Sequence, residues 1–111
     1  MDKIIIVEGK TDKERLELVL DEPVKILCSF GTLDVEKLEE WIEQYQNDEL
    51  YILTDADEAG NKLRHQIQRE LPNVHHLYTQ KMYREVATTP LDYLTSVLER
   101  AHFAVKEIRE E

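Results

Sequence analysis

Two apolar runs, each ending in acidic side chains, constrain the fold of this chain more than any other feature. Residues 4–7 are followed by Glu8, and residues 50–54 are followed by Asp55 and Asp57. The first run is continuous and β-branched, which is typical of a strand buried on both faces of a parallel sheet, and residues 50–54 are also expected to form a strand. Because the carboxyl ends of parallel strands share one edge, we expect the three acids to meet there.

The remaining sequence alternates between strand and helix patterns. Strands are expected at residues 3–7, 24–30, 50–54 and 74–78, and helices at 12–20, 34–46, about 58–71 and after Pro90. Residues 103–105 are compatible with a short edge strand. This order predicts an α/β fold, a compact doubly wound (Rossmann-like) sheet of about four parallel strands flanked by helices. With 111 residues, we expect a single domain over residues 1–111.

Two threonines are the expected helix starts. Thr11 and Glu14 have the spacing of a capping box, and Thr89 precedes Pro90 as the cap of the last helix. Asp57 could be a helix cap in place of a metal ligand, because an Asp after a strand often caps the next helix. Capping would account for Asp57 but not for Asp55. Glu58 is expected to face solvent in the first helical turn and not to be a ligand.

Charge and cysteine content exclude several classes of protein. The formal net charge is −10, and Cys28 is the single cysteine, so an internal disulfide and a cysteine-rich zinc site are excluded. The four histidines lack zinc-ligand spacing, and adjacent His75 and His76 would point to opposite faces of a strand. Without a membrane-length apolar run or a signal-peptide pattern, the expected location is cytoplasmic, away from the membrane.

The acids at the predicted sheet edge favour a metal. Carboxylates held close together repel one another, and a bound divalent cation relieves that repulsion. Basic residues are concentrated immediately after the second acidic turn, since residues 60–85 carry five Lys and Arg against two acids. We therefore predict a Mg²⁺-type site formed by Glu8, Asp55 and Asp57, with a short basic stretch beside it.

With these two acidic turns the chain resembles topoisomerase–primase (TOPRIM) domains. Their pattern is a glutamate after the first strand and Asp-x-Asp-x-x-Gly after the third. Glu8 matches the first element, and the segment from Asp55 to Gly60 matches the second. Gly31 stands in the turn after the second strand, where such domains commonly carry a glycine. The resemblance covers about residues 3–80 and leaves a C-terminal helix and tail at about 89–111.

Residues 7–12, Val-Glu-Gly-Lys-Thr-Asp, are most similar to the small stand-alone TOPRIM nucleases, including the ribonuclease that matures 5S ribosomal RNA. The resemblance implies that Asp55 and Asp57 hold Mg²⁺ (or Mn²⁺), with Glu8 as a further ligand or as a general acid or base. Lys10 is the second candidate catalytic residue. The candidates for contact with substrate phosphate are Lys62, Arg64, Lys81 and Arg84, which are otherwise ordinary solvated surface residues.

Three functions remain open at this level. The first is a small Mg²⁺-dependent nuclease that acts on RNA or DNA. The second is a non-catalytic, metal-binding TOPRIM module that works with a protein partner, which the sequence pI of 4.8 favours because an acidic chain repels phosphates. The third is a phosphorylatable receiver domain, ranked last because only one acid follows the first strand. Strand passage and primer synthesis are not expected.

Overall fold

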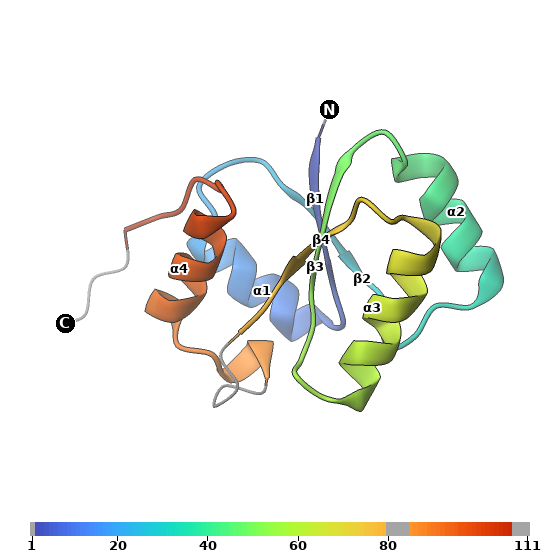
Figure 1. Cartoon of the computed structure of the whole chain (residues 1–111). Coiled ribbons are helices and arrows are strands. Elements are labelled where there is room, and N and C mark those ends of the chain that lie inside the picture. The colour runs from blue at the N-terminus through green and yellow to red at the C-terminus, as the bar shows by residue number, and fades with distance from the viewer. Residues whose placement is uncertain (1, 80–84, 108–111) are drawn as a thin grey trace.

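The computed structural model describes residues 2–79 and 85–107, and it forms an alternating α/β fold. The elements in chain order are β1 (Lys3–Val7), α1 (Lys10–Val19), β2 (Lys25–Cys28), α2 (Val35–Tyr45), β3 (Glu49–Leu53), α3 (Glu58–Glu70), β4 (His75–Leu77), the 3-10 helix η1 (Val86–Thr88) and α4 (Leu91–Arg100). Figure 1 shows the strands as a central layer between two pairs of helices.

All four strands are parallel, in the order β2-β1-β3-β4. The chain therefore leaves β1 toward β2 on one side and later returns to place β3 on the other side of β1. This reversal makes the boundary between β1 and β3 a topological switch point, where ligands commonly bind in open α/β sheets. The expected doubly wound parallel sheet is confirmed.

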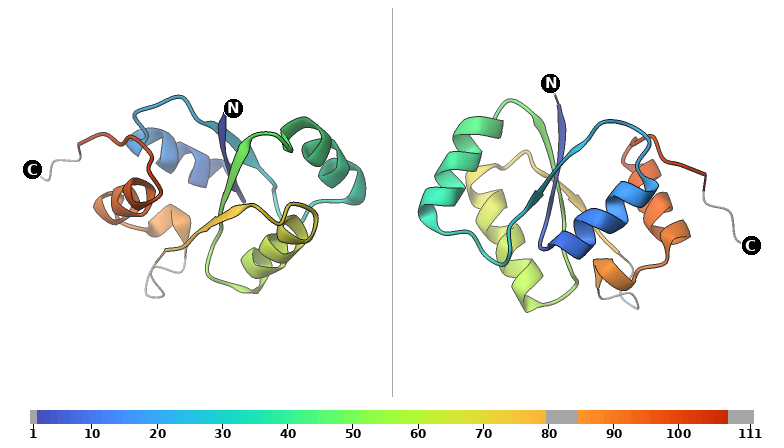
Figure 2. Two further views of the ribbon diagram at one scale, coloured as in Figure 1. Left: turned by 45° about the horizontal axis from the view of Figure 1, so that its top comes forward. Right: turned by 180° about the vertical axis from the view of Figure 1, so that it is seen from behind.

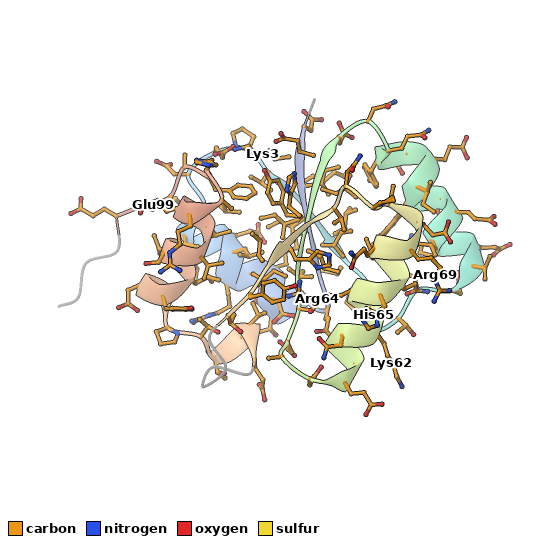
Figure 3. All side chains as sticks on the ribbon, viewed as in Figure 1. Lys3, Lys62, Arg64, His65, Arg69 and Glu99 are labelled. Carbon is orange, nitrogen blue, oxygen red and sulfur yellow. The ribbon has the colours of Figure 1, made fainter. Side chains whose placement is uncertain are left out.

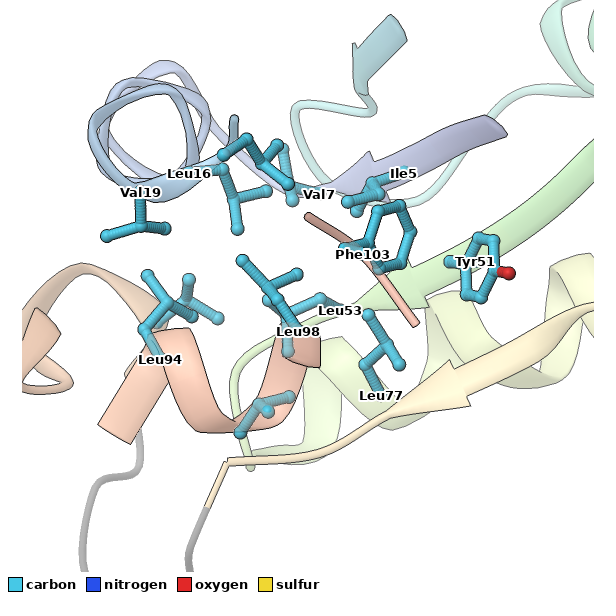
Figure 4. Close-up of a cluster of buried hydrophobic side chains, with 13 residues drawn as sticks. Ile5, Val7, Leu16, Val19, Tyr51, Leu53, Leu77, Leu94, Leu98 and Phe103 are labelled. Atoms are coloured by element: carbon cyan, nitrogen blue, oxygen red, sulfur yellow. The ribbon is translucent and has the colours of Figure 1, made fainter. Parts of the chain in front are cut away.

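Each face of the sheet has its own hydrophobic core. Ile5 and Val7 pack with α1 and α4, whereas Ile4 and Ile6 pack with α2 and α3. This alternation follows from the two-residue period of a strand, and it explains why β1 is apolar at every buried position. Figure 2 shows the same division of the helices from two further directions, and Figure 4 shows the core on the α1 and α4 side.

The predicted helix starts are wrong at both threonines. Helix α1 begins at Lys10, and the side chain that binds its first turn is Asp12, whose Oδ2 accepts a hydrogen bond from the Gly9 amide at 3.1 Å. Thr89 does not cap α4, because its hydroxyl donates to the carbonyl of Glu85 at 2.8 Å. Threonine is a common capping residue. Here Asp12 binds the Gly9 amide at the start of α1, and the Thr89 hydroxyl binds the Glu85 carbonyl, so neither threonine acts as a cap.

The second strand and the tail are shorter than expected. Strand β2 ends at Cys28, and Phe30 lies beyond it with a positive φ of 54°. In place of an edge strand at 103–105, one antiparallel bridge joins Leu20 to Val105. Over the part of the chain described here, none of the helices has the length and hydrophobicity needed to cross a bilayer.

Candidate functional site

Glu8 and Asp55 come together at the carboxyl edge of the sheet. Strands β1 and β3 are hydrogen-bonded neighbours with Ile6 opposite Ile52, so the residues that follow them emerge side by side. The Asp55 amide donates a hydrogen bond to Glu8 Oε1 at 2.8 Å, although 47 positions separate the two residues. Two of the three acids predicted from the sequence therefore lie in contact at the switch point.

Asp57 lies in the turn that connects β3 to α3. It is the N-cap of α3, and its Oδ1 accepts a hydrogen bond from the Gly60 amide at 2.7 Å. The capping role anticipated as an alternative for this residue is thus observed. The hydrogen bond from Gly60 occupies one carboxylate oxygen of Asp57 and fixes the orientation of the other.

Gly60 is required by the close packing of this turn. A Cβ atom built at Gly60 would lie 2.1 Å from the Asp55 carbonyl oxygen and 3.0 Å from the Thr54 hydroxyl. Backbone atoms cannot yield to such an overlap without moving the turn. The glycine of the Asp-x-Asp-x-x-Gly pattern therefore allows the first turn of α3 to lie directly against Asp55.

Asp55 also ties the site to the segment before α4. Its Oδ1 accepts a hydrogen bond from the Val86 amide at 2.8 Å, and Val86 is fully buried. The side chains of Glu8, Asp55 and Asp57 thus each use one oxygen to bind a backbone amide. Among the described residues, no donor binds the second oxygen of any of the three. Within residues 2–79 and 85–107, each of these three carboxylates therefore keeps one oxygen without a hydrogen-bond donor.

Asp12 is a fourth acid at this edge that the sequence analysis did not select. Asp12 is buried, with 7% of the residue exposed. Burial is the main cause that raises the pKa of its carboxyl group, and the negative charge of Asp55 raises it further. An acid in the first turn of a helix is so common that it carries no signal of its own. The usable signal was its spacing of three residues from Gly9, which is that of a capping side chain.

The acids at this edge lie close enough to raise the pKa of Glu8 through their negative charges. Burial raises the pKa of Glu8, and the charges of Asp55, Asp57 and Asp12 raise it further, against the lowering effect of the hydrogen bond from the Asp55 amide. No group of three His, Cys, Asp or Glu side chains within residues 2–79 and 85–107 forms a ready-made metal cage. Mg²⁺ does not need one, because it keeps several waters and commonly binds through one or two carboxylates. The donor set fits a hard divalent cation.

Replacing Asp12 by Asn should stabilise the metal-free protein at neutral pH. An acid whose pKa is raised on folding loses stabilisation as pH rises above its ordinary value, here 3.8. Asn keeps an oxygen for the Gly9 amide without the charge. We expect Asp12→Asn to raise the thermal midpoint by a few °C at pH 8 and to lose this advantage as pH falls toward 4.

Thermal unfolding in EDTA at several pH values checks this result. The exposed Glu17→Gln on the same helix is the matched control and should not change the midpoint appreciably. An advantage of Asp12→Asn that stays constant from pH 8 to pH 4 would show that the charge of Asp12 is not the cause.

The candidate basic residues occupy different positions. Lys10 is exposed as the first residue of α1, two positions after Glu8. Lys62 is exposed on α3, where its Nζ lies 3.5 Å from Glu58 Oε1, and Figure 3 shows it pointing away from the sheet. Lys81 and Arg84 lie outside the described residues. The structure thus leaves Lys10 and Lys62 accessible near the acidic edge.

The expectation of a solvated surface residue is wrong for Arg64. Only 6% of it is exposed, and its guanidinium donates to the carbonyls of Ile52 at 3.4 Å and Leu77 at 2.5 Å. Burial lowers the pKa of this group. Figure 3 shows the side chain on the face of α3 that meets the sheet. Arg64 therefore links β3 to β4, and its Nη atoms are engaged by the protein's own carbonyls in place of a phosphate.

The two adjacent histidines point to opposite faces, as predicted. His75 stacks on Tyr51, with ring centroids 4.8 Å apart, whereas His76 Nδ1 lies 3.1 Å from Arg64 Nη1. Burial and the neighbouring Arg64 lower the pKa of His76. A neutral His76 accepting from Arg64 is consistent with a structural role.

Comparisons with known proteins agree with this geometry. The Toprim domain family matches residues 3–86. An uncharacterised protein of Bacillus subtilis strain 168, YusF, is 45% identical over 108 residues, which is 97% of this chain and 74% of YusF. The solved structure of a small TOPRIM domain protein from Bacillus stearothermophilus has a TM-score of 0.91 and 47% identity, over 96% of this chain and 90% of that one.

Part of the chain is also similar to ribonucleases. Ribonuclease M5 of Mycoplasma mycoides subsp. mycoides is 39% identical over 72 residues, which is 64% of this chain and 41% of the ribonuclease. The matched region is therefore less than half of that relative. The family match includes both acidic turns and the sheet edge at which they meet, and the chain belongs to the Toprim domain family.

Proposed function

We propose that this protein is a small Mg²⁺-dependent nuclease that hydrolyses phosphodiester bonds in RNA or DNA. The observation that carries the proposal is the contact between Glu8 and Asp55 at the topological switch point, with Asp57 in the next turn. Support also comes from the similarity to ribonuclease M5, of which the matched region is 41%.

The proposed roles follow from how each carboxylate is held. Asp55 and Asp57 would hold the cation with the oxygens not used by the Val86 and Gly60 amides. A bound divalent cation activates water and compensates charge on a leaving oxygen. Glu8 would be a further ligand or the group that accepts and returns a proton, and burial raises its pKa above the ordinary value of a glutamate.

Exposed lysines would position the substrate. Lys10 lies at the amino end of α1, close in sequence to Glu8, where an ammonium group can meet a non-bridging phosphate oxygen. Lys62 would do the same from α3 after leaving its exposed ion pair with Glu58, which is worth little in water. Lys81 and Arg84 remain predictions as phosphate contacts. A cytoplasmic location also remains a prediction.

The test is a cleavage assay on labelled single-stranded, hairpin and duplex RNA and DNA. We expect cleavage with Mg²⁺ or Mn²⁺ and none with EDTA. Glu8→Gln retains an oxygen for the Asp55 amide but cannot transfer a proton, so it should cut at least roughly 100-fold more slowly. Glu58→Gln, which changes an exposed acid of the same region, should retain wild-type activity.

A second candidate is a non-catalytic, metal-binding module that works with a protein partner. The net charge of −10 favours it, and so does the commitment of Arg64 to backbone carbonyls, which removes one cation from the substrate surface. Mg²⁺ binding without cleavage of any of the substrates at low salt would select this module over the nuclease. Equal cleavage by wild type and Glu8→Gln would instead reject the assigned role of Glu8.

A further inference from the structure

Two exposed aromatic side chains follow the two outer strands of the sheet. Phe30 is 77% exposed and Tyr78 is 62% exposed, and they are two of four large hydrophobic residues that are exposed in the described part of the chain. Phe30 lies after β2, and Tyr78 directly follows β4. Aromatic side chains stabilise a fold mainly through the large apolar area that they bury, and these two side chains bury little of theirs.

The order of the strands places these aromatics on either side of the acids. Across the carboxyl edge, β2-β1-β3-β4 are followed by Phe30, Glu8, Asp55 and Tyr78, respectively. The Phe30 amide donates to the Glu8 carbonyl at 2.7 Å. A pocket of about 240 Å³ is lined by both Asp55 and Tyr78. Phe30 is therefore a neighbour of Glu8, the proposed proton-transfer group, and Tyr78 is a neighbour of Asp55, a proposed metal ligand.

A side-chain contact holds Tyr78 in place, and Phe30 has an unusual backbone conformation. The Arg64 guanidinium lies 4.2 Å from the centroid of the Tyr78 ring, and Arg64 is itself fixed by the Leu77 carbonyl. Phe30 has a φ of 54° and precedes Gly31 at φ 101°. A bulky residue is disfavoured in this left-handed region, where Gly or Asn would be less strained. Because Phe30 gains little burial in return, folding does not explain its presence.

We propose that Phe30 and Tyr78 are stacking platforms for two unpaired nucleotides on either side of the phosphate at the acidic edge. This inference rests on the proposed function and narrows its substrate to single-stranded or unpaired nucleic acid. From β2 to β4 there are three strand spacings, or roughly 14 Å, which leaves room for a phosphate between the platforms. Stacking on aromatic rings tolerates any base.

The charge of the protein supports this mode of binding. A chain of net charge −10 gains little from attraction to phosphates, whereas base stacking does not depend on protein charge. Paired bases in a duplex have their faces covered by neighbouring bases, so they are not accessible to side-chain rings. An acidic protein with two exposed rings should therefore prefer unpaired strands.

Binding can be measured by fluorescence anisotropy with a labelled 12-nucleotide strand of DNA or RNA and the matching duplexes. All variants are made in the Glu8→Gln background with Mg²⁺ present, so that cleavage does not interfere. The single strand should bind at least about ten-fold more tightly than the duplex. Phe30→Leu and Tyr78→Leu, which keep apolar bulk but remove the ring, should each weaken binding by roughly ten-fold.

Three controls separate stacking from loss of structure. Phe30→Trp and Tyr78→Phe keep a ring and should bind as tightly as the parent. Leu18→Ala removes an exposed apolar side chain from α1, away from this edge, and should have no effect. Phe30→Gly should weaken binding while raising the thermal midpoint, because it relieves the left-handed strain.

Two results would overturn the inference, and they are distinguishable. If duplex binds as well as single strand, or if both Leu variants bind normally, the stacking role is wrong, while Mg²⁺-dependent cleavage of a duplex would leave the proposed function standing. If the parent binds no nucleic acid and the wild type cleaves none, the proposed function and this inference fail together.

Discussion

Asp55→Asn should abolish Mg²⁺-dependent cleavage, with a loss of roughly 1,000-fold or more, because a metal-bound carboxylate site supplies several kcal/mol of transition-state stabilisation. The amide oxygen of Asn can still accept the hydrogen bond from the Val86 amide, so the local structure should be retained. Removing one charge also relieves Glu8 and Asp12, whose pKa values Asp55 raises. The metal-free variant should therefore be more stable than wild type.

Stability and cleavage measured on the same preparations distinguish this account from simple damage to the fold. In wild type, millimolar Mg²⁺ should raise the thermal midpoint by mass action, and in Asp55→Asn it should not. Glu58→Gln is the matched control, because Glu58 is exposed, lies three residues after Asp55 and forms an ion pair with Lys62. An Asp55→Asn variant that cleaves normally, or that responds to Mg²⁺ as wild type does, would contradict the assignment.

Gly60→Ala should destabilise the protein by about 3 kcal/mol or more and lower the thermal midpoint by more than 10 °C. The added Cβ would lie 2.1 Å from the Asp55 carbonyl oxygen, so the turn or the start of α3 must move. At an ordinary helix position the same change is stabilising by up to about 1 kcal/mol, because Ala is the better helix former. The expected sign is thus opposite to that given by helix propensity.

Urea unfolding of Gly60→Ala beside Asn61→Ala tests this directly. Asn61 is the next residue of α3 and is exposed, so its replacement by Ala should leave stability unchanged or slightly raised. A neutral or stabilising Gly60→Ala would mean that the turn is looser than the close contact with Asp55 implies. Because the turn orients Asp55 and Asp57, Gly60→Ala should also weaken the response to Mg²⁺.

The sheet and its acidic edge were predictable because strong, redundant signals specify them. A continuous apolar strand such as residues 4–7 needs cover on both faces, and the helix patterns between the strands supply it in a parallel fold. Parallel strands then bring the residues that follow them to one edge, which is where Glu8 and Asp55 lie. Whether these residues bind metal stays a prediction.

The features that were missed depend on competition between local bonds. Thr11 is a good capping residue, but Asp12 reaches the Gly9 amide and starts α1 earlier. Arg64 has the composition of a surface residue, yet the carbonyls at the ends of β3 and β4 make its burial favourable. Phe30 extends an apolar pattern, but the turn gives it a positive φ. None of these outcomes follows from residue type and spacing alone.

A paramagnetic ion can locate the metal site on the protein directly. Substoichiometric Mn²⁺ added to ¹⁵N-labelled wild type should broaden the amide signals of Gly9, Asp55 and Gly60 first, while those of Asp21 and Leu71, beyond the opposite ends of α1 and α3, persist. The same titration of Asp55→Asn should give no selective broadening. If the strongest broadening instead falls on the acidic helix α2, or on all surface acids equally, the carboxyl edge is not a metal site.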